Sequence, residues 1–287
     1  MMRSLYSGVA GLKAHQTEMD VIGNNIANVN TYGFKMSRVT FRDVYYQTLA
    51  GASAGNGVLG GSNPTQIGYG SNIASVDVIN SQSGMATTGQ SSDLYIDGEG
   101  YFVIQDGVDT DGNSTYLYTR VGSLSFDGEG NLVDGNKRIV CGGNADSSGE
   151  VTIDPENPEP IKIEDDLVGK LGSFEFSADG TITGVNSEDG TVVTIGKIAL
   201  ADIPNPQGLT QIGGSYYKAM NNTGVISCYA PGEGTVGSLV PGSLETSNVD
   251  LANEFAQMII TQRGFQANSK IITVSDEMLE TLVGMKR

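Results

Sequence analysis

The side chains that most often carry out chemistry in proteins are scarce in this 287-residue chain and lie far apart. His15 is the single histidine, and Cys141 and Cys228 are the two thiols. His15 falls inside a segment expected to be helical, where packing or solvent exposure is its favoured role, and one histidine cannot complete a Ser/His/Asp or Cys/His set. The cysteines are compatible with a disulfide, although two separate thiols in strands are favoured because their spacing carries no pairing signal. The sequence therefore offers no catalytic site.

Two acidic and two glycine-rich stretches resemble ligand-binding loops. Residues 109–113, DTDGN, resemble the start of a calcium loop. That loop requires glycine at its sixth position and glutamate at its twelfth, where this chain has serine and arginine, so we interpret the stretch as a turn. The sequence GEG at 98–100 and 128–130 predicts hairpin turns, because no helix follows to hold a phosphate. The acidic run at 164–166 predicts a solvated loop. We expect no metal, no cofactor and no enzyme activity.

Composition and charge favour a turn-rich β protein. The chain contains 40 glycines, no tryptophan and 17% charged residues. Its net charge of −17 disfavours binding to a nucleic-acid backbone. Residues 1–48 carry five Lys/Arg against three Asp/Glu, whereas residues 93–202 carry six against twenty-two. We therefore expect an acidic middle module between nearly neutral ends that can associate. The sequence contains no run of eighteen apolar residues, so we expect no transmembrane helix. We also expect no cleavable signal.

Both ends of the chain predict long amphipathic helices. Near the N-terminus, apolar residues recur every seven positions and line one side of a helix of about thirty residues. This stripe consists of Leu5, Leu12, Met19 and Ile26. Near the C-terminus, apolar residues alternate by four and three positions, a pattern typical of a coiled-coil seam. The second stripe consists of Leu251, Phe255, Met258, Phe265, Ile272, Leu279 and Val283, with polar interruptions at Gln262, Ser269 and Asp276. Ser247 or Asn248 is expected to cap this helix.

Between the helices, alternating apolar residues predict strands. Residues 93–104 contain two apolar runs around a glycine-rich turn, which indicates a hairpin. Residues 122–132 and 172–182 share one spacing and predict two related hairpins. Residues 50–64 are almost wholly small and polar and predict a mobile loop.

We therefore predict an α+β fold in which the two terminal helices pair as a coiled-coil-like domain and a mostly antiparallel β domain is inserted between them. The expected domains are 1–35 with 243–287 for the helices, 36–85 for an extended linker, and 86–242 for the β domain. The alternative is two ordinary surface helices on one globular core.

Motifs at both ends of the chain resemble those of bacterial flagellar rod and hook proteins. The N-terminal motif is DVIGNNIAN at 20–28 with YGFK at 32–35, and the C-terminal motif begins with GSLETSNVDL at 242–251. DGEGYF at 97–102 and YTRVGS at 118–123 resemble the β domain of the same family. The motif positions are Asn24, Asn25, Ala27, Asn28, Gly33, Phe34, Asn248 and Val249.

The resemblance implies an axial structural subunit, located in the flagellar hook or basal body, that polymerises through the two apolar stripes. The implied partners are further copies of the chain, the rod, hook-cap and hook-filament junction proteins, and the flagellar type III export apparatus. Neither nucleic acid nor membrane insertion is implied.

Two members of the family fit the sequence. The start MMRSLYSGV and the VDLA motif at 249–252 are similar to compact hook proteins and favour a hook subunit, the flexible joint between rod and filament. The length and the sequence QIGYG at 66–70 are similar to the distal rod protein, which is the alternative. We hypothesise that residues 50–64 distinguish a bendable hook from a rigid rod. Outside the family, a secreted adhesin with an acidic β module is the competing hypothesis.

Overall fold

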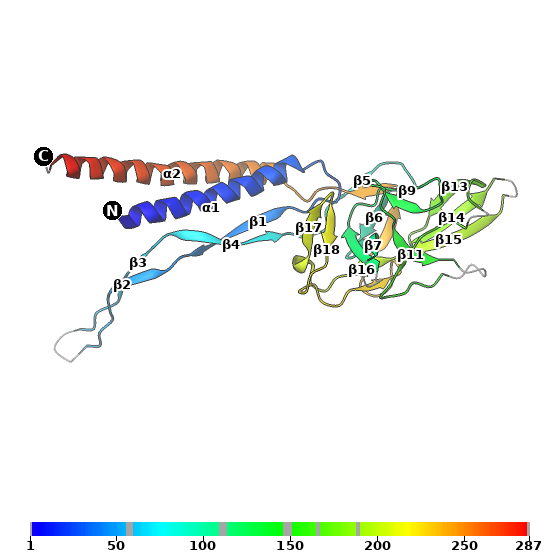
Figure 1. Ribbon diagram of the computed structural model, residues 1–287, viewed down its shortest axis with the longest axis horizontal. Helices are drawn as coiled ribbons and strands as arrows, with labels where there is room; N and C mark the ends of the chain where they lie inside the picture. Colours follow the sequence, from blue (N-terminus) through cyan, green and yellow to red (C-terminus); the bar gives the residue numbers. More distant parts are fainter. Residues whose placement is uncertain are drawn as a thin grey trace. The chain divides into compact units, whose positions relative to one another are not determined.

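The computed structural model describes most of the chain (Figure 1). The described residues are 2–55, 60–108, 114–145, 151–164, 167–187 and 190–285. The chain forms two compact units. Unit 1 consists of Met1–Val29, Met36–Ile79 and Val249–Arg287, and unit 2 consists of Asn30–Lys35 and Asn80–Asn248.

Unit 1 is built on two antiparallel helices, α1 (Met2–Ala27) and α2 (Leu251–Gly284). The two chain termini lie at the same end of this pair (Figure 1). Asp250 caps α2, and its carboxylate accepts hydrogen bonds from the amides of the second and third helical residues at 2.9 and 3.4 Å. The predicted cap at Ser247 or Asn248 is therefore wrong. Asp250 supplies the same short acceptor, with the negative charge that a helix N-terminus favours.

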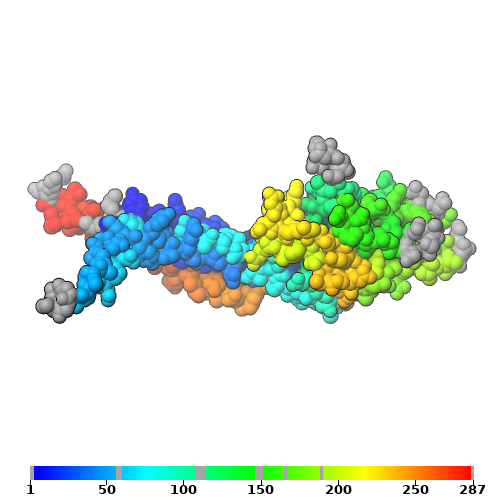
Figure 2. Space-filling view, turned by 90° about the horizontal axis from the view of Figure 1, so that it is seen from below, coloured from blue at the N-terminus to red at the C-terminus, as the bar shows by residue number. Residues whose placement is uncertain are grey.

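Two β-ribbons complete unit 1. β1 (Ser37–Asp43) pairs with β4 (Ser71–Val78), and β2 (Tyr46–Ala50) pairs with β3 (Thr65–Gly68), both antiparallel. In the space-filling view the β1–β4 ribbon lies in front of the helices, with α1 visible along one edge of the ribbon and α2 along the opposite edge (Figure 2). The ribbon contacts α1. We expected residues 36–85 to be an extended linker, but residues 36–79 instead fold with the helices. Every residue of β2 and β3 is exposed.

Unit 2 contains two larger antiparallel sheets. The six-stranded sheet has the order β17-β18-β8-β7-β16-β19, and the five-stranded sheet has the order β12-β11-β15-β14-β13. Three further pairs are β9 with β10, β6 with β20, and β5 with β21. The bounds of these elements are β5 (Met85–Thr87), β6 (Leu94–Asp97), β7 (Tyr101–Val108), β8 (Ser114–Thr119), β9 (Leu124–Phe126), β10 (Leu132–Asp134), β11 (Cys141–Asn144), β12 (Glu159–Pro160), β13 (Leu171–Phe176), β14 (Thr181–Asn186), β15 (Val192–Ile198), β16 (Leu200–Asp202), a 3-10 turn (Pro206–Gly208), β17 (Thr210–Gly213), β18 (Tyr216–Lys218), β19 (Ser227–Tyr229), β20 (Ser238–Pro241) and β21 (Ser243–Glu245). The predicted α+β fold with two terminal helices is confirmed.

Local hairpins were predicted well, and the longer-range pairing was not. The two related hairpins form as β9–β10 and β13–β14. Their turns match, because Gly130 and Gly180 both take left-handed φ values, 83° and 79°. The predicted hairpin at 93–104 is wrong, since β6 pairs with β20 while β7 pairs with β8 and β16. Gly98 lies against Gly237, so the glycine-rich segment serves a close crossing of two chain segments rather than a tight turn.

The interior of unit 2 holds two main apolar clusters. One centres on Leu94, Phe102 and Ile182, and the other contains Cys141 and Cys228. Both cysteines are free, and burial raises the pKa of each thiol from 9.0 to about 12. Two separate thiols in strands were the favoured expectation, and the structure confirms it.

Candidate assembly interface

Small residues let α1 and α2 approach closely. A Cβ atom added to Gly11 would lie 2.6 Å from Asn268 Nδ2, and one added to Gly8 would lie 3.3 Å from Ile272 Cγ1. On the other helix, a Cβ atom on Gly264 would lie 2.7 Å from His15 Nε2. Larger side chains at these glycines would push the helices apart. The closest contacts within the chain therefore depend on glycines, one of which packs against Ile272.

Polar side chains also take part in this contact. Glu254, Thr261 and Ser275 are the buried residues of α2, and with the half-buried Asn268 they recur every seven residues. Ser275 Oγ lies 3.5 Å from Ser4 Oγ on α1. The polar interruptions were predicted one residue further along the chain. Gln262 and Asp276 are exposed and Ser269 is half-buried, so that register is wrong.

The predicted apolar stripes divide between half-buried and exposed positions. The half-buried members are Leu5, Leu12, Met19, Ile26, Met258, Ile272 and Leu279. The exposed members are Leu251, Phe255, Phe265 and Val283. The second group lies outside the contact between α1 and α2, where glycines and buried polar residues meet. Their role in assembly stays a prediction.

One flank of α2 is apolar and exposed. It consists of Ile260, Ile271, Val274, Met278 and Leu282, whose spacing places them on one face. Ile260 is 62% exposed. The opposite flank carries exposed Leu251 and Phe255 in the first turns of α2 and is polar beyond them, with Gln262, Gln266, Ser269, Thr273, Asp276 and Glu280. A long exposed apolar face beside a polar one marks an interaction surface.

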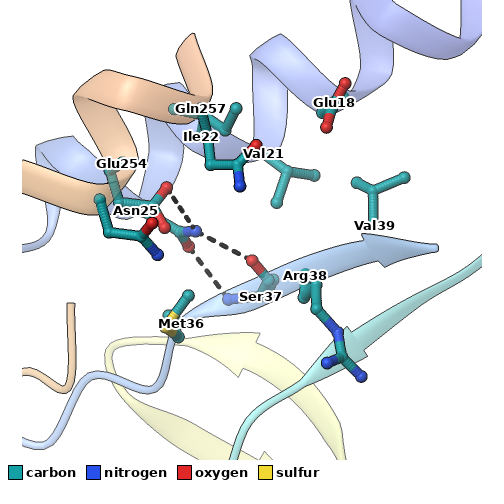
Figure 3. A pocket seen from close by; sticks show the side chains of 11 residues that line it. Glu18, Val21, Ile22, Asn25, Met36, Ser37, Arg38, Val39, Glu254 and Gln257 are labelled. Carbon is teal, nitrogen blue, oxygen red and sulfur yellow. Dashed lines mark hydrogen bonds between the residues drawn. The ribbon is translucent and has the colours of Figure 1, made fainter. Parts of the chain in front are cut away.

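Asn25, a motif residue, joins three elements of unit 1. Its side chain is 1% exposed and donates from Nδ2 to Ser37 O at 2.9 Å and to Glu254 Oε2 at 3.2 Å. Ser37 N donates back to Asn25 Oδ1 at 3.0 Å. Figure 3 shows these bonds beside a cavity of about 220 Å³ that is also lined by Glu18 and Gln257. Asn25 thus ties α1 to both β1 and α2.

His15 packs against its neighbours, which is one of the two roles expected for it. Its Nδ1 lies 3.1 Å from Glu18 Oε2, and its ring centroid lies 5.8 Å from that of Phe41 on β1. Among the described residues, no group of His, Cys, Asp and Glu is arranged to hold a metal. Of the acidic stretches, residues 109–113, 165 and 166 lie outside the described residues.

A buried ionic cluster in unit 2 was missed by the sequence reasoning. Lys35 Nζ donates to Glu245 Oε1 at 2.6 Å, and the two side chains are 0% and 1% exposed. Arg120 NH1 lies 3.5 Å from Glu245 Oε2 and donates to Gly98 O at 3.0 Å. Its guanidinium carbon is 5.1 Å from the Tyr101 ring centroid, an arrangement that favours a cation. Burial lowers the pKa of Lys35 from 10.5, and the Glu245 carboxylate opposes that shift.

Lys35 and Glu245 lie close in sequence to points where the chain passes from one unit to the other. These passages follow residues 29, 35, 79 and 248. Lys35 Nζ also donates to Ser81 O at 2.8 Å, and Asn248 Nδ2 donates to Ser81 Oγ at 3.2 Å. The cluster therefore holds together segments of unit 2 that adjoin these passages. Its three charged residues stand within the motif stretches YGFK, YTRVGS and GSLETSN, and that placement was the available signal.

The remaining motif residues shape the ends of the helices and the turn after α1. Asn28 Nδ2 donates to Asn24 O and to Asn24 Oδ1, both at 2.9 Å, beside Ala27, the last residue of α1. Gly33 has a φ of 65° and donates from N to Glu245 O at 2.9 Å. Asn248 N donates to Phe34 O at 3.5 Å. Val249 begins the segment that leads into α2.

Comparison with known proteins identifies the class to which this arrangement belongs. Residues 5–35 match the flagella basal body rod protein model, residues 95–184 match the flagellar hook protein FlgE/F/G D1 domain, and residues 240–285 match the flagellar basal body rod FlgEFG protein C-terminal model. The chain belongs to the family of flagellar rod and hook proteins, which are structural components of the flagellum.

Individual relatives span the whole chain. It is 46% identical over 288 residues to the flagellar basal-body rod protein FlgG of Bacillus subtilis, with all of both chains covered. It is 33% identical over 291 residues to FlgG of Borreliella burgdorferi and 29% identical over 442 residues to the flagellar hook protein FlgE of that organism, again with both chains fully covered. Within the described residues, neither helix is long and apolar enough to span a membrane.

Proposed function

We propose that this chain is a distal rod subunit of the flagellar basal body. The rod relative aligns over its full length at 46% identity, whereas the hook relative needs an alignment of 442 positions and so carries long stretches that this chain lacks. The hook subunit favoured from the sequence therefore has weaker support than the rod alternative. The proposed role is structural and non-enzymatic. Export through the flagellar apparatus without a cleavable signal stays part of the proposal.

The exposed apolar flank of α2 carries the proposed mode of assembly. Ile271 of this flank reaches Gly8 on α1, whereas the other four members stay between 38% and 62% exposed. Full burial of one such aliphatic side chain contributes about 1.5–3 kcal/mol. Other copies of the chain, and neighbouring axial proteins, would supply that burial. A contact of this kind that does not close into a ring produces an open helical polymer.

Ile260→Asp tests this assembly surface. The substitution would place a carboxylate in the proposed contact between copies, where burial without a partner costs several kcal/mol, so we expect loss of polymer with an unchanged monomer. The matched control is Gln262→Asp, because Gln262 is also exposed on α2 but lies outside the apolar flank. Sedimentation and electron microscopy measure the polymer, and circular dichroism measures helix content.

Two results would count against the proposal. Normal polymer from Ile260→Asp would remove the apolar flank from the interface. Curved tubes from the unaltered chain would favour hook over rod, whereas straight tubes support the rod. Deleting residues 50–64 then tests whether that segment sets the difference, and unchanged tube shape and stiffness would contradict the hypothesis.

A further inference from the structure

Asp127 holds an unusual position among the Asp-Gly pairs of the chain. It opens the β9–β10 turn, where Asp127 N donates to Asn131 O at 2.9 Å. Its side-chain Oδ1 accepts a hydrogen bond at 2.6 Å from the amide of the very next residue, Gly128. Asp127 and Gly128 are both exposed, and no atom lies within 4 Å of a Cβ atom added to Gly128. The carboxyl group is therefore folded back onto an accessible backbone nitrogen.

The other described Asp-Gly pairs hold their carboxylates away from that nitrogen. Asp134 Oδ1 accepts from two amides further along the turn, both at 2.9 Å, and its Oδ2 accepts from Tyr216. Asp179 Oδ2 accepts from Thr181 Oγ1 at 3.0 Å.

In the two remaining pairs, the aspartate carboxylate likewise accepts a hydrogen bond from a group other than the following amide. Asp106 Oδ1 accepts from Arg138 at 2.5 Å, and Asp97 Oδ1 accepts from Gln82 at 3.3 Å. Among the pairs that the structure describes, only the carboxylate of Asp127 is engaged by its own following amide.

The geometry points to Asp127–Gly128 as a site of spontaneous backbone isomerisation. The Gly128 nitrogen attacks Cγ of the carboxyl group in its acid form. A C–N bond forms, the carboxyl C–OH bond breaks, and one water leaves with the amide proton, which closes a five-membered succinimide. One water then adds back, and cleavage at the Cα carbonyl leaves an isoaspartyl link. The cycle has no net change in composition and requires no oxidant or reductant.

The product would alter the turn. An isoaspartyl link routes the main chain through Cβ and adds one atom between Asp127 and Gly128. The turn cannot accommodate the extra atom without moving Gly130, which is closely packed. A Cβ atom added to Gly130 would lie 3.2 Å from Ile163 Cβ and 2.9 Å from Val168 Cγ2. We therefore infer a slow, age-dependent loosening of the β9–β10 turn.

Peptide mapping of the aged, full-length protein tests this inference. The folded chain is incubated at neutral pH, and isoaspartate is counted in each peptide by enzymatic methylation and fragmentation mass spectrometry. Because the reacting groups are already ordered, we expect about tenfold more isoaspartate at Asp127 than at Asp134 or Asp179. In urea this preference should disappear. Peptides containing Asn56–Gly57, which lie outside the described residues, are counted separately.

A pair of glycine variants separates geometry from composition. Gly128→Ala crowds the attacking nitrogen and should lower the yield at Asp127 about tenfold, as expected when a near-attack arrangement is lost. Gly135→Ala is the matched control, because neither glycine has a left-handed φ or a close neighbour. Equal yields at Asp127 and Asp134 in the folded chain would overturn the inference. A yield at Asp127 that Gly128→Ala leaves unchanged would also overturn it.

Discussion

Lys35→Met isolates the contribution of the buried ionic cluster. The substitution keeps the length and apolar stem of the side chain but removes the ammonium that lies 2.6 Å from Glu245 Oε1. The Glu245 carboxylate then remains 1% exposed, with only the Ser83 amide at 3.0 Å and the more distant Arg120 to stabilise it. Leaving one partner of a buried ion pair uncompensated costs about 3–5 kcal/mol. We expect unit 2 to lose stability by that amount.

A double-mutant cycle gives the sharper test. Glu245→Gln alone leaves Lys35 and Arg120 facing each other without an anion, and should cost a similar amount. In the double variant, the uncharged side chains at both positions leave Arg120 with its existing contacts to Gly98 and the Tyr101 ring. The double variant should therefore lose at least about 2 kcal/mol less than the sum of the two single losses.

Urea unfolding followed by tyrosine fluorescence suits this measurement, because the chain has 12 tyrosines and no tryptophan. Helix content measured in parallel separates unit 1 from the β-rich unit 2. Additive losses in the cycle would refute the reasoning, since they would mean that Lys35 and Glu245 do not stabilise each other. A loss below about 1 kcal/mol for Lys35→Met would do the same, because that value is typical of an exposed ion pair.

Two further predictions concern backbone conformation and pH. Gly33→Ala should lower the free energy of unfolding by more than the roughly 1–2 kcal/mol that a left-handed φ imposes on alanine, because the new Cβ atom would also lie 2.9 Å from a valine side chain. The control is Gly89→Ala, where φ is 75° and no neighbour is close. Equal losses for the two variants in urea unfolding would contradict the contact argument. In the folded chain the thiols of Cys141 and Cys228 each have a pKa of about 12, whereas in the unfolded chain the pKa is 9.0. Stability should therefore be intact below pH 9 and fall between pH 9 and 12, where only the unfolded chain releases these protons. The slope is about 1.4 kcal/mol per pH unit for each thiol, and the double alanine variant should show a smaller slope in urea titrations.

The helices were predictable because their evidence is local. A seven-residue recurrence indicates a helix whatever lies beside it. Which face meets the partner helix was not predictable from hydrophobicity alone. The closest approach uses Gly8, Gly11 and Gly264, while several large apolar residues of the predicted stripe stay exposed. The glycines were visible in the sequence, but an apolar seam was the simpler expectation for two stripes.

In unit 2, local pairings were also predictable, whereas long-range pairings were not. The β9–β10 and β13–β14 hairpins join neighbouring segments, so turn chemistry identified them. β6 pairs with β20 across more than a hundred residues of intervening chain, and no local signal specifies that pairing. The ionic cluster was hidden for a similar reason. Charged residues are mostly exposed, and only tertiary structure shows that Lys35 meets Glu245.

The position of the ionic cluster in the sequence sets an order for folding. Glu245 lies near the end of the chain, and α2 begins only at Leu251. A chain that emerges N-terminus first therefore holds α1 without its helical partner, and Lys35 without its carboxylate, until almost every residue is available. Contacts between such distant segments carry a large loop-closure entropy and slow the final step. The hairpins of unit 2 can form early, while unit 1 stays open until the chain is nearly complete. This delay keeps the helical ends unpaired during chain elongation.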